Sequence, residues 1–129
     1  GIRNVISFDE AFQELIDTYP KKTPSGRRLH SDLARCKKLY MKEIVKKKTV
    51  DESMHSLIIQ CTRFMLSEKR RSNSIDYLKA LPAFLNIKEW ETVREEVELI
   101  IAKGGIIGKK SIMTEGDSEN KTVKGGGFE

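Results

Sequence analysis

Hydrophobic residues recur at spacings of three and four along most of residues 7–103, a pattern typical of helices that each bury one face. On the first such segment the apolar positions are Phe8, Phe12, Leu15, Ile16 and Tyr19. Ser7 and Glu10 form a capping box at the start of this segment. We expect the helix to end at Tyr19-Pro20, because the residue before a proline resists the helical conformation.

Two longer segments follow the turn-forming residues 21–26. The apolar positions of the second segment are Leu29, Leu33, Cys36, Tyr40 and Ile44. We expect Ser31 to cap the helix that this segment forms. Thr49 and Glu52 form another capping box, which predicts the start of a third helix. The apolar stripe of the third helix consists of Met54, Leu57, Ile58, Cys61, Phe64 and Met65.

The remaining segments are shorter. We expect Ser74 to cap a short helix that stops near Pro82. The apolar residues of that helix are Ile75, Tyr77, Leu78 and Leu81. Asn86 and Glu89 form a weaker cap pair before the last helix, which ends at Gly104-Gly105. The apolar face of the last helix consists of Trp90, Val93, Val97, Ile100 and Ile101.

These patterns predict an all-α fold, a small single-domain bundle of about five helices over residues 1–105. Strand signals are nearly absent. Residues 106–129 contain five glycines, scattered charges and little apolar periodicity, so we expect a flexible C-terminal tail there. Trp90 is expected to anchor the core, in preference to a role as a surface on which nucleic-acid bases stack.

Composition narrows the class of protein. No stretch of 18 apolar residues is present, which argues against a membrane span, and the N-terminus lacks a secretory signal pattern. Two cysteines are too few for a disulfide framework or a four-thiolate zinc site, so a reducing compartment is expected. We therefore expect a cytoplasmic protein.

Charge is distributed unevenly along the chain. The net charge is +5, yet residues 21–48 contain eleven lysines and arginines against two acids, a net charge of +9. Arg35, Lys38, Lys42 and Lys46 recur at spacings of three and four, opposite the apolar stripe of the second segment. This pattern favours binding to nucleic acid or another polyanion, with a merely solvated helix face as the alternative. Membrane-surface binding is less favoured, because the basic helix keeps no large apolar face to insert.

Catalytic chemistry has little support in the sequence. His30 is expected to be a solvated or capping side chain, and His55 lies off the apolar stripe with no other ligand at metal-binding spacing. Cys36 and Cys61 occupy core-facing positions, where free cysteines behave as small hydrophobes. No nucleophile, base and oxyanion site assemble, so we predict a non-enzymatic protein without a cofactor or a metal.

The acids of the last helix are expected to form a solvated outer face, with a docking surface for a basic protein as the alternative. These acids are Glu89, Glu91, Glu95, Glu96 and Glu98. In the tail, Phe128 and Glu129 resemble the acidic-aromatic tips through which single-strand-binding proteins recruit partners, and they are a second candidate partner-binding site.

The order of several short motifs resembles that of small DNA-metabolism proteins of tailed bacteriophages, of the replication accessory or helicase-loading type. The motifs are Phe8…Phe12…Tyr19-Pro20-Lys21-Lys22, a basic helix that ends near Tyr40, and Phe84-Leu85-Asn86…Trp90-Glu91. The resemblance covers roughly residues 8–91, and these motifs are mostly helix caps and core aromatics. It implies a helical viral protein that works on DNA or on a complex that handles DNA, in the cytoplasm of the host cell or in the virion.

Charge and resemblance together predict a DNA-binding or DNA-handling accessory protein of replication or packaging, which contacts phosphates without reading sequence. The candidate nucleic-acid-binding residues are Arg27, Arg28, Arg35, Lys37, Lys38, Lys42, Lys46, Lys69, Arg70 and Arg71. One alternative is a protein-interaction or structural component, such as a virion part or an adaptor on a polymerase or helicase, whose tail orders on binding. Another is a small terminase subunit, which requires a ring-shaped oligomer.

Overall fold

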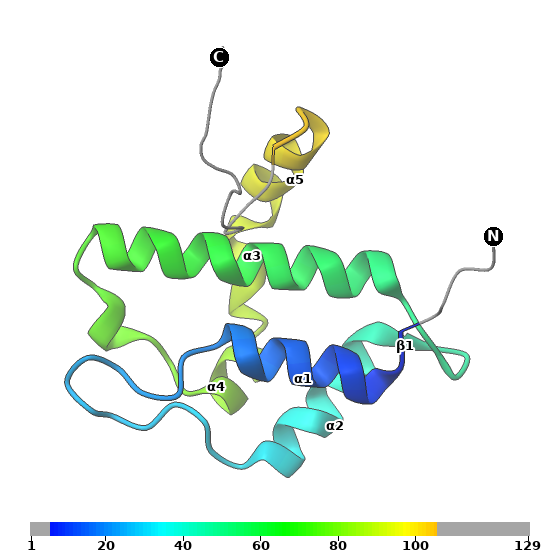
Figure 1. Cartoon of the computed structure of the whole chain (residues 1–129), viewed down its shortest axis with the longest axis horizontal. Coiled ribbons are helices and arrows are strands. Elements are labelled where there is room, and N and C mark those ends of the chain that lie inside the picture. Colours follow the sequence, from blue (N-terminus) through cyan, green and yellow to red (C-terminus); the bar gives the residue numbers. More distant parts are fainter. Residues whose placement is uncertain (1–5, 106–129) are drawn as a thin grey trace.

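One long helix, α3, runs through the middle of the structure and touches most of the other elements. The computed structural model describes residues 6–105. Along the chain the elements are α1 (Phe8–Thr18), α2 (Leu33–Ile44), β1 (Val45–Lys46), β2 (Thr49–Val50), α3 (Glu52–Arg71), the 3-10 helix η1 (Ile75–Tyr77), α4 (Leu81–Asn86), the 3-10 helix η2 (Glu89–Val93) and α5 (Arg94–Ala102). Figure 1 shows this order. The protein is a small, mostly α-helical domain, which confirms the predicted fold class.

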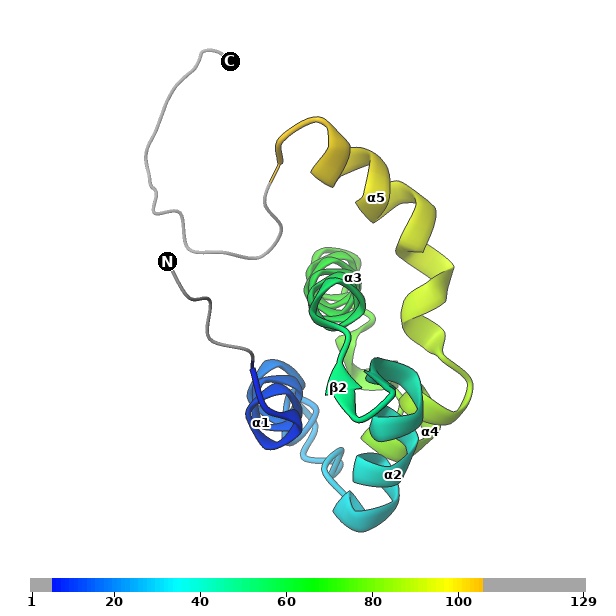
Figure 2. The same ribbon diagram turned by 90° about the vertical axis from the view of Figure 1, so that its right-hand side faces the viewer.

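The core lies around α3. Seen along its axis in Figure 2, α3 has α5 above it and α1 below it, with α2 and α4 beside α1. Apolar and small side chains on several faces of α3 make this possible, because each face can bury against a different neighbour. The buried residues of α3 are His55, Ile58, Ile59, Cys61, Thr62, Met65 and Leu66. Trp90 of η2 is 1% exposed, which confirms the expected core anchor.

The N-caps of the first two helices can be compared with those predicted from the sequence. The capping box of α1 is confirmed, since the Ser7 hydroxyl accepts from the Glu10 amide and the Glu10 carboxylate accepts from the Ser7 amide. Asp32, not Ser31, caps α2 by accepting from the backbone N–H of Arg35. Ser31 lies one residue too early, because the helix begins only at Leu33.

The predicted start of α3 is also wrong, because the chain forms a small hairpin just before it. Thr49 belongs to strand β2, which pairs with β1 in the register Val45↔Val50 and Lys46↔Thr49. Asp51 caps α3 instead, and its carboxylate accepts from the Met54 amide at 3.0 Å. The sequence carried no strand signal here, since the strands are only two residues long.

The hairpin changes the place of Lys46. Helix α2 ends at Ile44, so Lys46 lies on β1 and does not continue the helical row of cations. Leu33 also departs from the predicted stripe, because it is the first residue of α2 and stays 42% exposed. Leu29 is fully buried, but in the preceding loop, where its carbonyl accepts from the backbone N–H of Leu81.

The second half of the domain is broken into short pieces. Instead of one short helix that stops near Pro82, the chain forms the 3-10 turn η1 and then α4, which carries this proline in its first turn. A proline is tolerated there because the first helical N–H groups need no partner within the helix. Ser74 is at the N-cap position of η1, as predicted, but its side chain makes no capping hydrogen bond, while Asn86 is the last residue of α4 and caps no helix. The predicted last helix is divided into η2 and α5.

We predict that the cap of α3 is worth a measurable share of stability. Replacing Asp51 with alanine removes the acceptor for the Met54 amide, so the free energy of unfolding should fall by about 1 kcal/mol. Thermal denaturation should show a Tm lower by about 4–8 °C. Asp51→Asn keeps an acceptor and should lose less.

The matched control is Thr49→Ala, which changes the residue that the sequence pattern names as the cap. Since Thr49 is exposed and lies on β2, this variant should stay within about 0.5 kcal/mol of the parent. A larger loss in Thr49→Ala than in Asp51→Ala would contradict the structure.

Candidate nucleic-acid interface

Helix α2 presents a row of cations on the side opposite its buried face. Cys36, Tyr40 and Ile44 are fully buried, while Arg35, Lys38 and Lys42 are exposed. The spacings of three and four place the three cations on one stripe of the helix. We call these three residues the α2 stripe. The packing of the helix therefore decides which way the charges point.

The α2 stripe has no anionic partner within the described part of the chain. No acidic side chain of residues 6–105 lies within 4.0 Å of its charged groups. Lys37 differs, because it faces α1 and pairs with Asp9 at 3.2 Å. Glu43, an acid on α2 itself, is directed toward Lys88 at 3.4 Å. The stripe is thus uncompensated, while Lys37 is a weaker candidate for phosphate contact.

Three more lysines follow where α2 ends. Lys46, Lys47 and Lys48 are exposed on the β1–β2 hairpin, which projects from the C-terminal end of α2 (Figure 1). Among residues 6–105, none of the three forms an ion pair. The hairpin therefore extends the positive surface beyond the helix. The sequence pattern predicts instead that a continuing helix carries Lys46.

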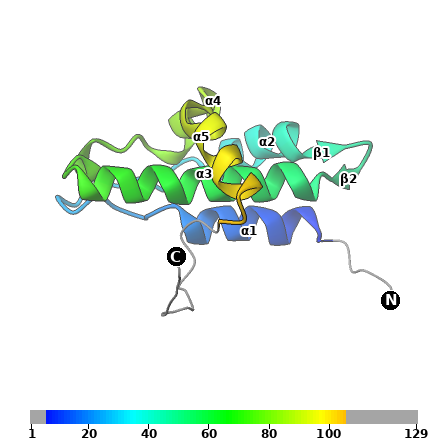
Figure 3. The same ribbon diagram turned by 90° about the horizontal axis from the view of Figure 1, so that it is seen from above.

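The second predicted cluster lies elsewhere. Lys69, Arg70 and Arg71 occupy the last turn of α3, whereas the hairpin immediately precedes its first turn. A helix of 20 residues is about 30 Å long, so α3 separates the two groups by that distance. Figure 3 shows the two ends of α3 apart in this way. Arg71 pairs with Glu68 in the same helix. The structure does not bring this cluster onto the α2 stripe.

Arg27 holds the loop before α2 in place. Its guanidinium donates to the carbonyls of Asp76 at 2.8 Å and Leu78 at 2.5 Å. The backbone N–H of Ser25 donates to the Asp76 carboxylate, and this bond holds the pKa of that carboxyl below its usual range. The Arg27 guanidinium therefore has a structural role, because it joins this loop to the segment around η1. Its neighbour Arg28 is exposed and stays a candidate for phosphate contact.

A chain of polar side chains, buried at Tyr40 and His55, joins α1, α2 and α3, and no sequence pattern indicates it. The Tyr40 hydroxyl lies 2.6 Å from Nδ1 of His55, and Nε2 of the same histidine lies 2.8 Å from the Glu14 carboxylate. His55 is 4% exposed, so the expectation that it lies off the buried face is wrong. The three residues are far apart in sequence, which explains why no spacing pattern revealed them. Burial, and then the charge of Glu14, raise the pKa of Tyr40, so its hydroxyl stays protonated.

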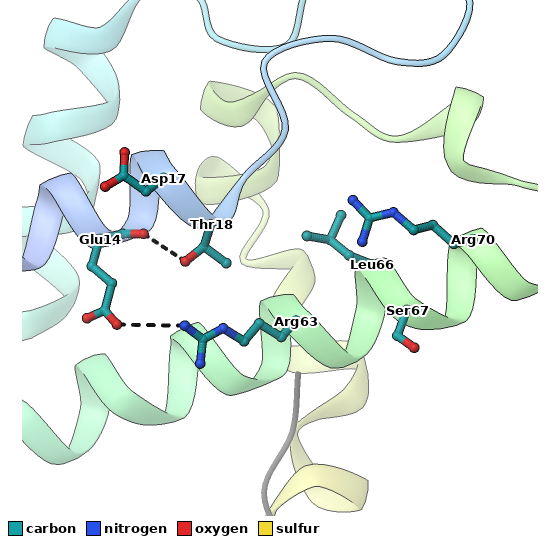
Figure 4. A pocket seen from close by; sticks show the side chains of 7 residues that line it. All are labelled: Glu14, Asp17, Thr18, Arg63, Leu66, Ser67 and Arg70. Carbon is teal, nitrogen blue, oxygen red and sulfur yellow. Dashed lines mark hydrogen bonds and ion pairs between the residues drawn. The ribbon is translucent and has the colours of Figure 1, made fainter. Parts of the chain in front are cut away.

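Glu14 also faces a surface pocket between α1 and α3. The pocket measures about 550 Å³ and is lined by Glu14, Asp17, Thr18, Arg63, Leu66, Ser67 and Arg70. Figure 4 shows the Glu14 carboxylate and the Arg63 guanidinium directed toward each other, at 3.9 Å. The lining contains no histidine or cysteine to serve as a base or thiol nucleophile. The acids and arginines compensate one another, so the pocket lacks the net positive charge of the α2 stripe.

The other candidate groups are placed as follows. Nε2 of His30 lies 2.8 Å from the carbonyl of Tyr19, the C-cap residue of α1. Cys36 and Cys61 are free and buried, as predicted. Within residues 6–105 no group of acids, histidines and cysteines is arranged to hold a metal ion, and none of the helices there is long and apolar enough to cross a membrane. Phe128, Glu129 and the predicted tail lie outside the described residues.

Comparisons with known proteins found no relative. No family model matches the chain, and neither a curated protein nor a solved structure matches it. The resemblance to phage DNA-metabolism proteins therefore stays a prediction.

We predict that Arg27 and Arg28 have different roles despite being adjacent. Arg27→Ala leaves two carbonyls without their charged donor, so the free energy of unfolding should fall by about 1.5 kcal/mol in urea denaturation. Arg28→Ala removes an exposed side chain and should change stability by less than about 0.5 kcal/mol. Equal losses in the two variants would contradict a structural role for Arg27.

We also predict that the two thiols are unreactive in the folded protein. Burial raises the pKa of both Cys36 and Cys61 to about 11, so about 0.1% of each is thiolate at pH 8. A thiol-specific chromogenic reagent should react slowly at pH 8 and rapidly after urea is added. Fast reaction without urea would show that the thiols are accessible.

The same shift gives a pH dependence. Because the pKa of each thiol is higher in the folded than in the unfolded chain, folding favours the protonated form. The contribution to stability is complete below about pH 8.5 and is lost as pH rises toward 11. Urea denaturation between pH 8 and pH 11 should show this loss in the parent, and a smaller loss in the double variant Cys36→Ala/Cys61→Ala.

Proposed function

We propose that this protein is a non-enzymatic DNA-binding accessory protein that holds DNA by its phosphates. The observation that supports this most is the α2 stripe, three exposed cations on one face of a helix, with no acidic side chain of the described chain within 4.0 Å of their charged groups. Neighbouring like charges on a helix repel one another, and a polyanion removes that repulsion. The hairpin lysines add to the same positive surface.

The expected binding is electrostatic and independent of base sequence. Three phosphate contacts release condensed counterions, so log K should fall with log salt concentration with a slope of about −2.7 on duplex DNA. The hairpin lysines would make the slope steeper. Contacts of this kind position a protein on DNA without reading its bases. A role in handling DNA for replication or packaging is consistent with this mode.

An acidic protein surface is the competing partner for the same stripe. Arg35, Lys38 and Lys42 would pair with carboxylates as readily as with phosphates, although DNA presents a denser row of charge. The two partners can be distinguished with nuclease, which destroys DNA as a partner but leaves an acidic protein partner intact. Both proposals place the contact on α2.

The test is the charge reversal Lys38→Glu/Lys42→Glu. Both side chains are exposed, so the variant should fold, and its affinity for a 30-base-pair duplex in 50 mM salt should fall about tenfold or more. The salt slope should become less negative by about 2, which fluorescence anisotropy over a salt series would measure.

The matched control is Lys79→Glu/Lys103→Glu, which changes the net charge equally at two other exposed lysines. Its affinity should fall far less than that of the α2 variant. Equal losses would mean that only net charge matters, and no binding by the parent at low salt would overturn the proposal. A partner protein that is captured despite nuclease, and lost in Lys38→Glu/Lys42→Glu, would favour the protein-binding alternative.

A further inference from the structure

The tip of the β1–β2 hairpin has an unfavourable sequence for its shape. Lys47 and Lys48 form the two-residue turn and have positive φ angles of 52° and 67°. A turn with two positive φ angles suits Asn-Gly, because other side chains clash with the backbone in this conformation. Lys46 adds a third positive charge in succession. Both the backbone and the charges here act against stability.

An apolar pocket opens at the base of this hairpin. It measures about 520 Å³ and is lined by Ile6, Ser7, Phe8, Met41, Val45, Lys48, Thr49 and Val50. Met41 is 44% exposed, while Phe8 is partly buried against the core. The volume falls in the range of pockets that hold small organic groups. Lys48 belongs both to the pocket and to the strained turn, so a cation stands beside the apolar surface.

We infer that the hairpin and this pocket form a binding site for single-stranded nucleic acid, with one unpaired base in the pocket and the flanking phosphates on the hairpin lysines. A nucleotide joins a flat, largely apolar base to an anionic phosphate, which is the pairing of surfaces found here. The thioether of Met41 and the ring of Phe8 both line the pocket, and groups of these two kinds contact the face of a base favourably.

The form of the nucleic acid follows from access to its bases. In a duplex each base is stacked and paired, so it reaches a pocket only after unpairing, which costs free energy. A single strand has no such cost. Strain that persists at a surface turn also points to function, because Asn-Gly would serve the fold better. This inference rests on the proposed function. It adds that the hairpin, with its pocket, binds nucleic acid in single-stranded form.

The first measurement compares three probes on the full chain by fluorescence anisotropy in 50 mM salt. They are a 12-nucleotide oligothymidylate, a duplex with the same number of phosphates, and a 12-unit abasic strand that keeps only sugar and phosphate. Oligothymidylate should bind about tenfold more tightly than either of the others. Equal affinity for the abasic strand, or a preference for the duplex, would overturn the single-strand site.

The second measurement uses Lys47→Asn/Lys48→Gly, which removes two charges and supplies the favoured turn. Thermal denaturation should show a higher Tm than the parent, while affinity for oligothymidylate should fall about tenfold. The salt slope should become less negative by about 1.4, since each contact with a single strand contributes about 0.7. Lys79→Gln/Lys103→Gln is the control of equal charge. A hairpin variant that keeps full affinity would overturn the site.

The third measurement isolates the pocket from the charges. Met41→Ala leaves the net charge unchanged, and its exposed position makes loss of folding unexpected, which the Tm would check. It should bind oligothymidylate more weakly and lose most of the preference over the abasic strand, with an unchanged salt slope. An unchanged preference would overturn the role of the pocket.

The two proposals fail in different ways. If only the single-strand site is wrong, the duplex still binds and Lys38→Glu/Lys42→Glu still weakens it, while the hairpin and Met41 variants behave like the parent. If no probe binds at low salt, both proposals are wrong. Tighter binding of an acidic peptide than of oligothymidylate would also overturn the single-strand site.

Discussion

The burial of α3 is the constraint on which the rest of the structure depends. This helix packs against α1 on one side and against η2 and α5 on another, so the core exists only because several of its faces are apolar. Its length also sets the dimensions of the surface. The hairpin is held at one end and the basic cluster of residues 69–71 at the other, about 30 Å apart. A ligand that spans both would have to run the length of the domain.

The polar chain from Tyr40 through His55 to Glu14 explains how α2 is held against this helix. Each buried polar atom finds a partner on a different helix, which specifies the packing more narrowly than apolar contact alone. Phe8 and Phe12 surround the same tyrosine ring. Once Tyr40 is fixed inward, the 3.6-residue period of the helix carries Arg35, Lys38 and Lys42 outward. The outward direction of the charges thus follows from the burial of Cys36, Tyr40 and Ile44 on the other side of the helix.

Local rules predicted the fold class, the capping box of α1, the buried cysteines and the core position of Trp90, because each depends on residues close in sequence. They failed where distant contacts decide. The hairpin forms because Val45 and Val50 pair across a turn of lysines, which no turn preference indicates. The role of Arg27 depends on carbonyls some fifty residues away, and charge alone made it look like its neighbour Arg28. For the candidate site, the outward direction of the α2 stripe followed from periodicity, whereas its separation from residues 69–71 required the structure.

The basic surface differs in its energetics from one part to the next. On α2 the cations lie in good helical geometry, so their arrangement costs the fold only mutual repulsion. On the hairpin the fold also carries two residues with left-handed backbone, while an apolar pocket beside them remains open. Solubility alone does not require lysines with a left-handed backbone beside an open apolar pocket, because lysines with an unstrained backbone are hydrated equally well. On the proposed function, the stripe would therefore bind phosphates without reading base sequence, and the hairpin would make a contact whose geometry matters.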